Sequence, residues 1–259
     1  MNLINLMQES SFYFDMDVNL LSSFLKIYIF SFVVILLRYV FVSGLFYYLF
    51  WMKKIQSLGL HQKNLKPGQI RFELYWSITS TFIFAFASYL MIWLWQNGFT
   101  QIYLDFEKLN SAYLPLSFIF LLAFHEIYFY FSHVLIHRPK WYKKIHSIHH
   151  YSNPVTPWAS FSFHPYESLI HASFIPLFIC LVPVHPVVIF FYLIFMTMTA
   201  VSNHLGYEII KSKNIRSFFI SGEHHSIHHE KFKHNFGLYF TVLDKWFKTE
   251  YVKPEQRNS

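Results

Sequence analysis

The sequence is poor in the residues from which many common sites are built. Its 259 residues include one cysteine and seven glycines, and only 14% are charged. The single cysteine, Cys180, excludes a disulfide framework and a cysteine-ligated metal site, and it lies in an apolar run where a small buried residue is expected. The chain has no GxGxxG dinucleotide fingerprint, no CxxC series and no HExxH zinc motif. Catalysis that depends on those devices is therefore excluded.

Apolar and aromatic residues dominate instead, with 54% hydrophobic residues, 32 Phe and 18 Tyr. A transmembrane helix needs about 20 apolar residues, and three runs meet that length: 24–51, 77–95 and 114–132. Two shorter runs, 168–183 and 187–203, are separated by a Pro-Val-His-Pro sequence. They are either two tilted spans or a re-entrant hairpin. The pattern predicts an all-α integral membrane protein with about four to five transmembrane helices.

Charge distribution predicts the orientation of these spans. Residues 1–23 contain no Lys or Arg, whereas basic residues gather in 52–76, in 138–144 and in the tail from 211 onward. The positive-inside rule places the N-terminus outside and the basic segments in the cytoplasm. The shorter runs must then leave and return as a hairpin. The net charge of +7 is explained by basic loops beside anionic lipid, so no nucleic-acid partner is expected.

Histidine is the informative residue, because 14 of 16 histidines fall between His125 and His229. They include one HxxxH and two HxxHH clusters: His133 and His137; His146, His149 and His150; His225, His228 and His229. On a helix this spacing points each cluster in one direction. Neutral imidazole binds iron, zinc, copper or nickel, and eight imidazoles exceed the needs of one ion. We expect two metals in a cytoplasmic helical cap, with adjacent histidines splayed by about 100° and able to serve different metals.

Glu126 lies seven residues before His133 and eleven before His137, on the same helical stripe. A carboxylate in a span is costly and suggests function. We expect it to accept a hydrogen bond from a ligating imidazole; the alternative is a packing or snorkelling carboxylate. His125 lies off the stripe and is expected to be structural.

Several motifs resemble the fatty acid hydroxylase/sterol desaturase superfamily of membrane histidine-cluster di-iron oxidases. Residues 142–150 (YKKIHSIHH) resemble C-4 methyl sterol oxidases, and 156–165 resemble sterol C-5 desaturases. The segment from His224 to Asp244 is similar to the family's C-terminal motif. The likeness runs from about His125 to Thr249. The chain departs from the family's motifs at Val134, Leu243 and Lys248. None of these residues is a predicted ligand, but the departures leave the substrate subclass open.

The resemblance implies a ninth metal ligand, His204, in Asn203-His204-Leu205-Gly206-Tyr207. The alternative for His204 is a histidine at a helix end in the membrane interface. Asn203 is expected to support the ligands from outside the coordination sphere, and His164 and His224 either to do the same or to ligate. The histidines that match no motif are not expected to bind metal: His61, His171, His185 and His234.

The resemblance also implies the chemistry. We expect two iron ions (zinc in purified protein), O₂, and hydroxylation or desaturation of a membrane lipid, with sterol-like substrates slightly ahead of fatty acyl chains. Electrons are expected from a separate cytochrome b5, ferredoxin or flavin reductase. One oxidase domain spans 1–259, with N-terminal spans in 1–113 and the catalytic region in 114–250. A zinc-dependent membrane hydrolase, a metal transport protein and an inactive relative remain as alternatives.

Overall fold

The regular structure of the described chain is helical. The computed structural model describes residues 17–52, 65–106 and 108–252, and within them β-type pairing is limited to two isolated bridges. The all-α prediction is confirmed. The main helices are α3 (Leu21–Phe46), α5 (Gln69–Gln96), α6 (Tyr113–Ile136), α8 (Pro165–Leu181), α9 (Pro186–Asn203) and α11 (Gly222–Lys231). Short elements fill the connections: η1 (Tyr47–Met52), α7 (Pro139–Trp141), η2 (Tyr142–His146), η3 (His149–Tyr151), η4 (Pro157–Phe161), α10 (Lys213–Arg216) and α12 (Val242–Trp246).

Four helical segments of the described chain are long and apolar enough to cross a bilayer: Leu21–Met52, Gln69–Gln96, Tyr113–Ile136 and Pro186–Asn203. The second begins eight residues before the predicted run at 77–95. Its first turns carry polar Gln69 and Glu73, which are buried against the protein. Hydropathy alone underestimates this helix because those polar residues hydrogen-bond internally.

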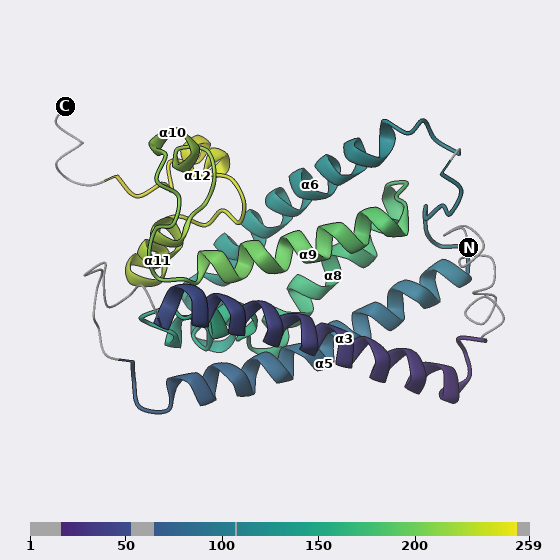
Figure 1. The fold of residues 1–259 in the computed structure, drawn as a ribbon, viewed down its shortest axis with the longest axis horizontal. Coiled ribbons are helices and arrows are strands. Elements are labelled where there is room, and N and C mark those ends of the chain that lie inside the picture. The colour runs from purple at the N-terminus through teal and green to yellow at the C-terminus, as the bar shows by residue number, and fades with distance from the viewer. Residues whose placement is uncertain (1–16, 53–64, 107, 253–259) are drawn as a thin grey trace.

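The two shorter apolar runs form a hairpin, α8 followed by α9 (Figure 1). Its tip contacts the connection between α5 and α6, where Gln101 N–H donates to Ile179 O at 2.7 Å and Tyr103 N–H donates to Val184 O at 3.3 Å. The other end of α8 lies beside the histidines. The pair therefore leaves the histidine end of the bundle and returns to it, as the charge pattern requires.

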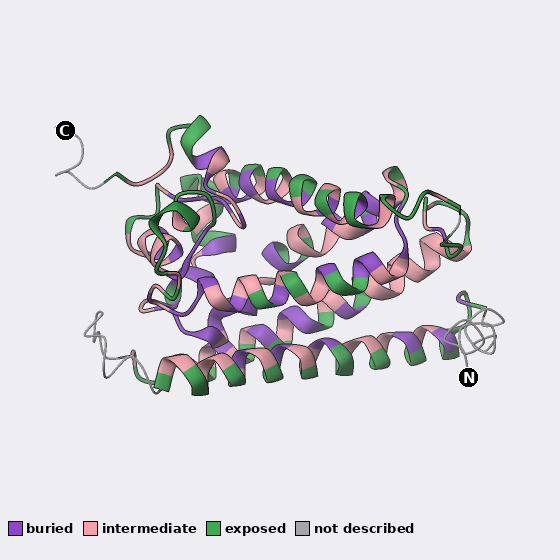
Figure 2. Cartoon of the chain, turned by 45° about the horizontal axis from the view of Figure 1, so that its top comes forward, coloured by how far each residue is buried: buried purple, intermediate pink, exposed green. Residues whose placement is uncertain are grey.

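Buried residues lie between the helices, and exposed apolar residues lie along their outer faces (Figure 2). The main core joins α6, α8 and α9 around Leu121, Phe178, Ile179 and Tyr192. A second cluster packs Ile35 and Tyr39 of α3 against η4. An apolar outer surface is expected of helices whose solvent is lipid.

The loop before η4 is anchored by a buried carboxylate on α5. Glu73 accepts a hydrogen bond from Thr156 Oγ1 at 2.6 Å and one from Gln69 Nε2 at 2.8 Å. Gln69 Nε2 also donates to Pro154 O at 2.7 Å, and Thr156 caps η4 by accepting from Trp158 N–H. This network fixes the chain that links the second histidine cluster to η4.

Replacing Thr156 with Val should lower the stability of the protein by about 1–3 kcal/mol, because it leaves the buried Glu73 carboxylate without one donor. The measurement is the Tm of purified protein in detergent. Thr79→Val is the matched control, since Thr79 Oγ1 donates to Tyr75 O on its own helix. Equal Tm values for the two variants would contradict this account of the loop.

Candidate metal centre

All the predicted ligands lie at one end of the bundle, although they come from separate elements (Figure 1). His133 is in the last turn of α6 and His137 follows it as the C-cap. His204 is the C-cap of α9, and the third cluster lies on α11. A Cβ at Gly222, in the first turn of α11, would collide with the carbonyl oxygen of Tyr207. Only glycine allows α11 to begin this close to the segment that carries His204.

The histidines form two groups, in each of which one ligand nitrogen per residue lies within 4.8 Å of all the others. Group A consists of His133, His137, His146, His150 and His228. Group B consists of His149, His204, His225 and His229. Neighbours in sequence belong to different groups, as the splay of adjacent residues predicts, so His149 faces group B and His150 faces group A.

Hydrogen bonds fix the tautomer of several rings. In group A, His133 Nδ1 faces Phe236 O at 2.9 Å and His146 Nδ1 faces Glu167 Oε1 at 2.6 Å. In group B, His204 Nδ1 faces Ala200 O at 2.7 Å, and His149 Nδ1 faces Ser162 O at 3.3 Å. A main-chain carbonyl can only accept, so Nδ1 of His133, His149 and His204 carries the proton and Nε2 of each of these neutral rings presents a lone pair.

These lone pairs point at one another. The Nε2 atoms of His133 and His146 are 3.2 Å apart, and those of His149 and His204 are 3.3 Å apart. In the His149–His204 pair neither nitrogen has a proton to share, so this contact is repulsive unless a cation lies between them. Metal–nitrogen bonds of about 2.1 Å meeting at about 90–109° separate two ligand nitrogens by about 3.0–3.4 Å. The spacing of the rings fits metal binding in both groups.

The ligands outside the spans are held neutral. Burial, and then the neighbouring imidazoles, lower the pKa values of His146, His149 and His150 well below their ordinary range. The same causes act on the three histidines of α11. Neutral imidazole is the form that ligates metals, so these sites are ready to bind at neutral pH.

Local structure differs from prediction in the second cluster. His146 ends the π-helical turn η2, and His149 and His150 lie in the 3₁₀ turn η3, so this cluster is not on a regular α-helix. Its side chains converge because the backbone tightens between the two turns. The spacing predicted which histidines lie together, but it did not predict this local conformation.

We expected Glu126 to accept a hydrogen bond from a ligating imidazole, and this expectation was wrong. Its carboxylate accepts from the main-chain N–H groups of Leu238 and Tyr239, the latter at 2.7 Å, and not from an imidazole. Glu167 has the predicted kind of contact instead, with His146 at 2.6 Å, and it is buried at the start of α8. Sequence reasoning missed Glu167, although a carboxylate opening an apolar helix is as unusual as one inside a span.

Glu126 and Asp244 together hold the loop that orients His133. Asp244 accepts from the N–H groups of Phe236 and Gly237 at 2.7 and 3.0 Å, and Phe236 O in turn faces His133. Burial would raise the pKa of Asp244, but hydrogen bonds from His224, Thr249 and the main chain outweigh it, and the pKa lies below its ordinary value. Both carboxylates support a ligand through the backbone.

The remaining candidates lie outside both groups. Asn203 Nδ2 donates to Leu238 O, in the loop of Phe236, at 3.0 Å. His224 Nε2 lies 3.4 Å from Oδ2 of Asp244, the carboxylate that holds this loop. His164 accepts from Tyr166 N–H and caps α8.

None of the other described histidines belongs to either group. His125 bonds to Tyr192, His185 caps α9, His171 lies 3.6 Å from Glu167, and the ring of His234 faces Thr249 O. His61 falls outside the described residues.

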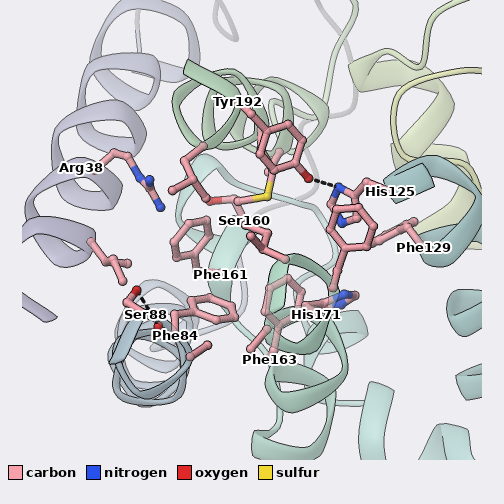
Figure 3. Close-up of a pocket in the computed structure, with 18 of the residues that line it drawn as sticks. Arg38, Phe84, Ser88, His125, Phe129, Ser160, Phe161, Phe163, His171 and Tyr192 are labelled. Atoms are coloured by element: carbon pink, nitrogen blue, oxygen red, sulfur yellow. Dashed lines mark hydrogen bonds between the residues drawn. The ribbon is translucent and has the colours of Figure 1, made fainter. Parts of the chain in front are cut away.

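An apolar pocket adjoins the centre, with walls from α3, α5, η4, α6, α8 and α9 (Figure 3). Phe129 lines it and lies 5.0 Å from His133 of group A, measured between ring centroids. Phe163 also lines it and lies 5.0 Å from His149 of group B. One wall of the pocket therefore touches both groups, and a bound apolar molecule would lie beside the ligands.

Comparison with known proteins identifies the family. A sequence model described as fatty acid hydroxylase matches residues 118–249, just over half of the chain. The chain belongs to the fatty acid hydroxylase family. Its four apolar helices and this membership identify it as an integral membrane protein.

Several curated relatives of this chain have names that refer to sterols. The chain is 26% identical over 209 residues to Delta(7)-sterol 5(6)-desaturase ERG3B of Gibberella zeae, covering 81% of this chain and 63% of that protein. It is 27% identical over 209 residues to the lathosterol oxidase of Mus musculus, covering 80% and 68%. It is 24% identical over 229 residues to Delta(7)-sterol 5(6)-desaturase ERG3 of Saccharomyces cerevisiae, covering 88% and 60%. No solved structure matches the chain.

The departures from the family motif have simple structural readings. Lys248 has φ of 58°, the left-handed conformation that glycine adopts readily, which explains why glycine is usual there. Leu243 packs with Tyr130 and Phe236, and Val134 lies against that cluster. All three lie outside groups A and B.

Replacing Glu167 with Ala should weaken metal binding by about 10–100-fold, because the His146 ring loses the acceptor that fixes its tautomer. The measurement is metal retained during titration with a chelator. Glu223→Ala is the control, since that half-exposed carboxylate pairs with Arg216. Retention like that of the control would show that Glu167 does not orient His146.

His225→Ala and His228→Ala should each reduce the metal content from about two ions per chain to about one, because His225 belongs to group B and His228 to group A. Elemental analysis of the purified variants measures this. His234→Ala is the control: His228 Nδ1 donates to the His234 main-chain oxygen at 2.7 Å, which the substitution keeps. Full metal content in both ligand variants would refute the assignment of the groups.

Proposed function

We propose that this protein is an O₂-dependent non-haem di-iron oxidoreductase that hydroxylates or desaturates an unactivated C–H position of a membrane lipid. The observation that carries the proposal is the convergence of nine histidines in two groups beside an apolar pocket. The family and the names of its relatives support it.

Groups A and B would each hold one iron ion through Nε2. When bound, two irons supply the activation of O₂ needed to remove hydrogen from an unactivated carbon. The protein's own residues do the rest: Glu167, Phe236 O and Ala200 O orient the ligand rings, while Phe129 and Phe163 line the pocket next to His133 and His149. Purified protein is expected to carry zinc in place of some iron, given the affinity order.

The substrate that we propose first is a lipid with a sterol-like ring system, and a fatty acyl chain is the second candidate. The relatives named for sterols support the first. Residues of the first spans, such as Ile35 and Phe84, line the pocket together with Phe174 and Tyr192. We therefore propose that the N-terminal spans and the catalytic region act as one domain. Electrons would come from a separate donor protein docking near the basic segments.

The competing functions fit the geometry less well. A zinc hydrolase of the common HExxH type places its glutamate beside a metal-binding histidine on one helix, and that motif is absent from the sequence. A transporter needs ligands along a path through the bilayer, whereas both histidine groups lie at one end of the bundle (Figure 1). An inactive relative would have no need to retain all nine histidines.

Iron-loaded protein supplied with an electron donor, oxygen and candidate lipids should yield a product heavier by one oxygen or lighter by two hydrogens, detected by mass spectrometry. His149→Ala should abolish the product, because it removes a group B ligand, and His61→Ala should not. Lipid analysis of a deletion strain, compared with one carrying His149→Ala, identifies the natural substrate. Turnover that continues without oxygen would refute the mechanism.

We also propose that the histidine end faces the cytoplasm and the N-terminus lies outside. Single cysteines at Ser10 and Gln256, in a Cys180→Ala background, should react with an impermeant maleimide from opposite sides: the first in intact cells, the second only after permeabilisation. The reason is the basic charge of the tail and its absence from residues 1–23. Opposite sides require an odd number of membrane crossings between the two positions. Labelling of both positions from the same side would contradict this orientation.

A further inference from the structure

Arg38 is a charged residue inside the first span, on α3, and it lines the pocket. Among the described residues, its guanidinium has no hydrogen-bond or ion-pair partner, and its Nε is buried. Figure 3 shows the side chain directed from α3 into the pocket. A charge in a membrane span is expensive and is normally paired, so this arrangement requires an explanation.

The polar groups that share the pocket do not supply a partner. On the opposite wall, Tyr192 OH and His125 Nδ1 are hydrogen-bonded at 2.5 Å (Figure 3). Ser88 Oγ donates to Phe84 O within its own helix at 3.1 Å, and Ser160 Oγ lies 3.5 Å from Ser43 Oγ. The rest of the lining is largely aromatic and aliphatic. The partner of Arg38 must come with the molecule that fills the pocket.

We propose that Arg38 binds a hydrogen-bond-accepting oxygen at the polar end of the lipid substrate. Arginine presents several N–H donors in a planar fork and binds carboxylates with particular strength, but it can also donate to a neutral hydroxyl. The wall formed by Phe129 and Phe163 lies next to the histidine groups. The lipid is therefore anchored at α3 by its oxygen and presents a carbon remote from that oxygen to the metal centre.

This inference rests on the proposed function, since it assumes that the pocket receives the lipid to be oxidised. The oxygen has two possible sources, the hydroxyl of a ring lipid or the carboxylate of an acyl chain. Two probe pairs separate them: cholest-7-en-3β-ol against its 3-deoxy hydrocarbon, and stearate against octadecane.

The test is equilibrium binding of radiolabelled probes to zinc-loaded protein in detergent, for wild type and Arg38→Met. Removing the oxygen from the matching probe should weaken binding to the wild type by about tenfold or more, as expected for a hydrogen bond to a charged group. The same change should matter less than about twofold in Arg38→Met. The pair that shows this dependence identifies the source of the oxygen, and loss of the same size in both proteins for both pairs would overturn the proposal.

Arg71→Met is the matched control, because Arg71 is an exposed residue of α5 that does not line the pocket. If Arg38→Met does not fold, Arg38→Lys replaces it, since lysine keeps the charge but loses the fork. The Arg38→Lys protein should discriminate between the matched probes several-fold less than the wild type does. Discrimination equal to that of the wild type would overturn the proposal. Binding needs no turnover, so Arg38-dependent binding without O₂-dependent product would count against the proposed reaction alone.

Discussion

The rest of the structure depends on a cluster of unprotonated imidazole nitrogens that face one another. In one of these contacts, His149 with His204, both rings have their protons committed to main-chain carbonyl oxygens on the opposite side. Buried lone pairs at such separations repel, and a cation between them would remove the repulsion. We therefore propose that metal binding and folding of this end of the bundle are coupled.

The surrounding elements set these nitrogens in place from several directions. Glu167 on α8 acts directly on His146. Glu126 and Asp244 act at a distance, by holding the loop whose Phe236 carbonyl orients His133. Carboxylates buried in an apolar bundle are costly unless they accept hydrogen bonds. Glu126 and Asp244 each accept several, whereas Glu167 contacts His146 through Oε1 and its buried Oε2 has no partner among the described residues. The same helices shape the pocket, so the substrate site and the metal site share their walls.

The sequence was sufficient to predict the helical class, the histidine clusters and the alternation of adjacent ligands, because all three follow from local spacing and apolar run length. It could not place Glu126 or find Glu167, because their partners lie 112 and 21 residues away in the chain. Nor could it predict the π and 3₁₀ turns around His146–His150, which are set by packing. Arg38 was visible only as an interruption in a span, and its position in the pocket needed the tertiary fold.

The central claim is that both groups bind metal through imidazole nitrogen alone. X-ray absorption spectroscopy of the metal-loaded protein measures the coordination sphere most directly. The account predicts four to five nitrogen ligands per metal at about 2.0–2.2 Å, with imidazole scattering in the outer shells, and loss of part of that signal in both His146→Ala and His204→Ala. A first shell dominated by sulfur or carboxylate oxygen, or a spectrum unchanged in those variants, would contradict it.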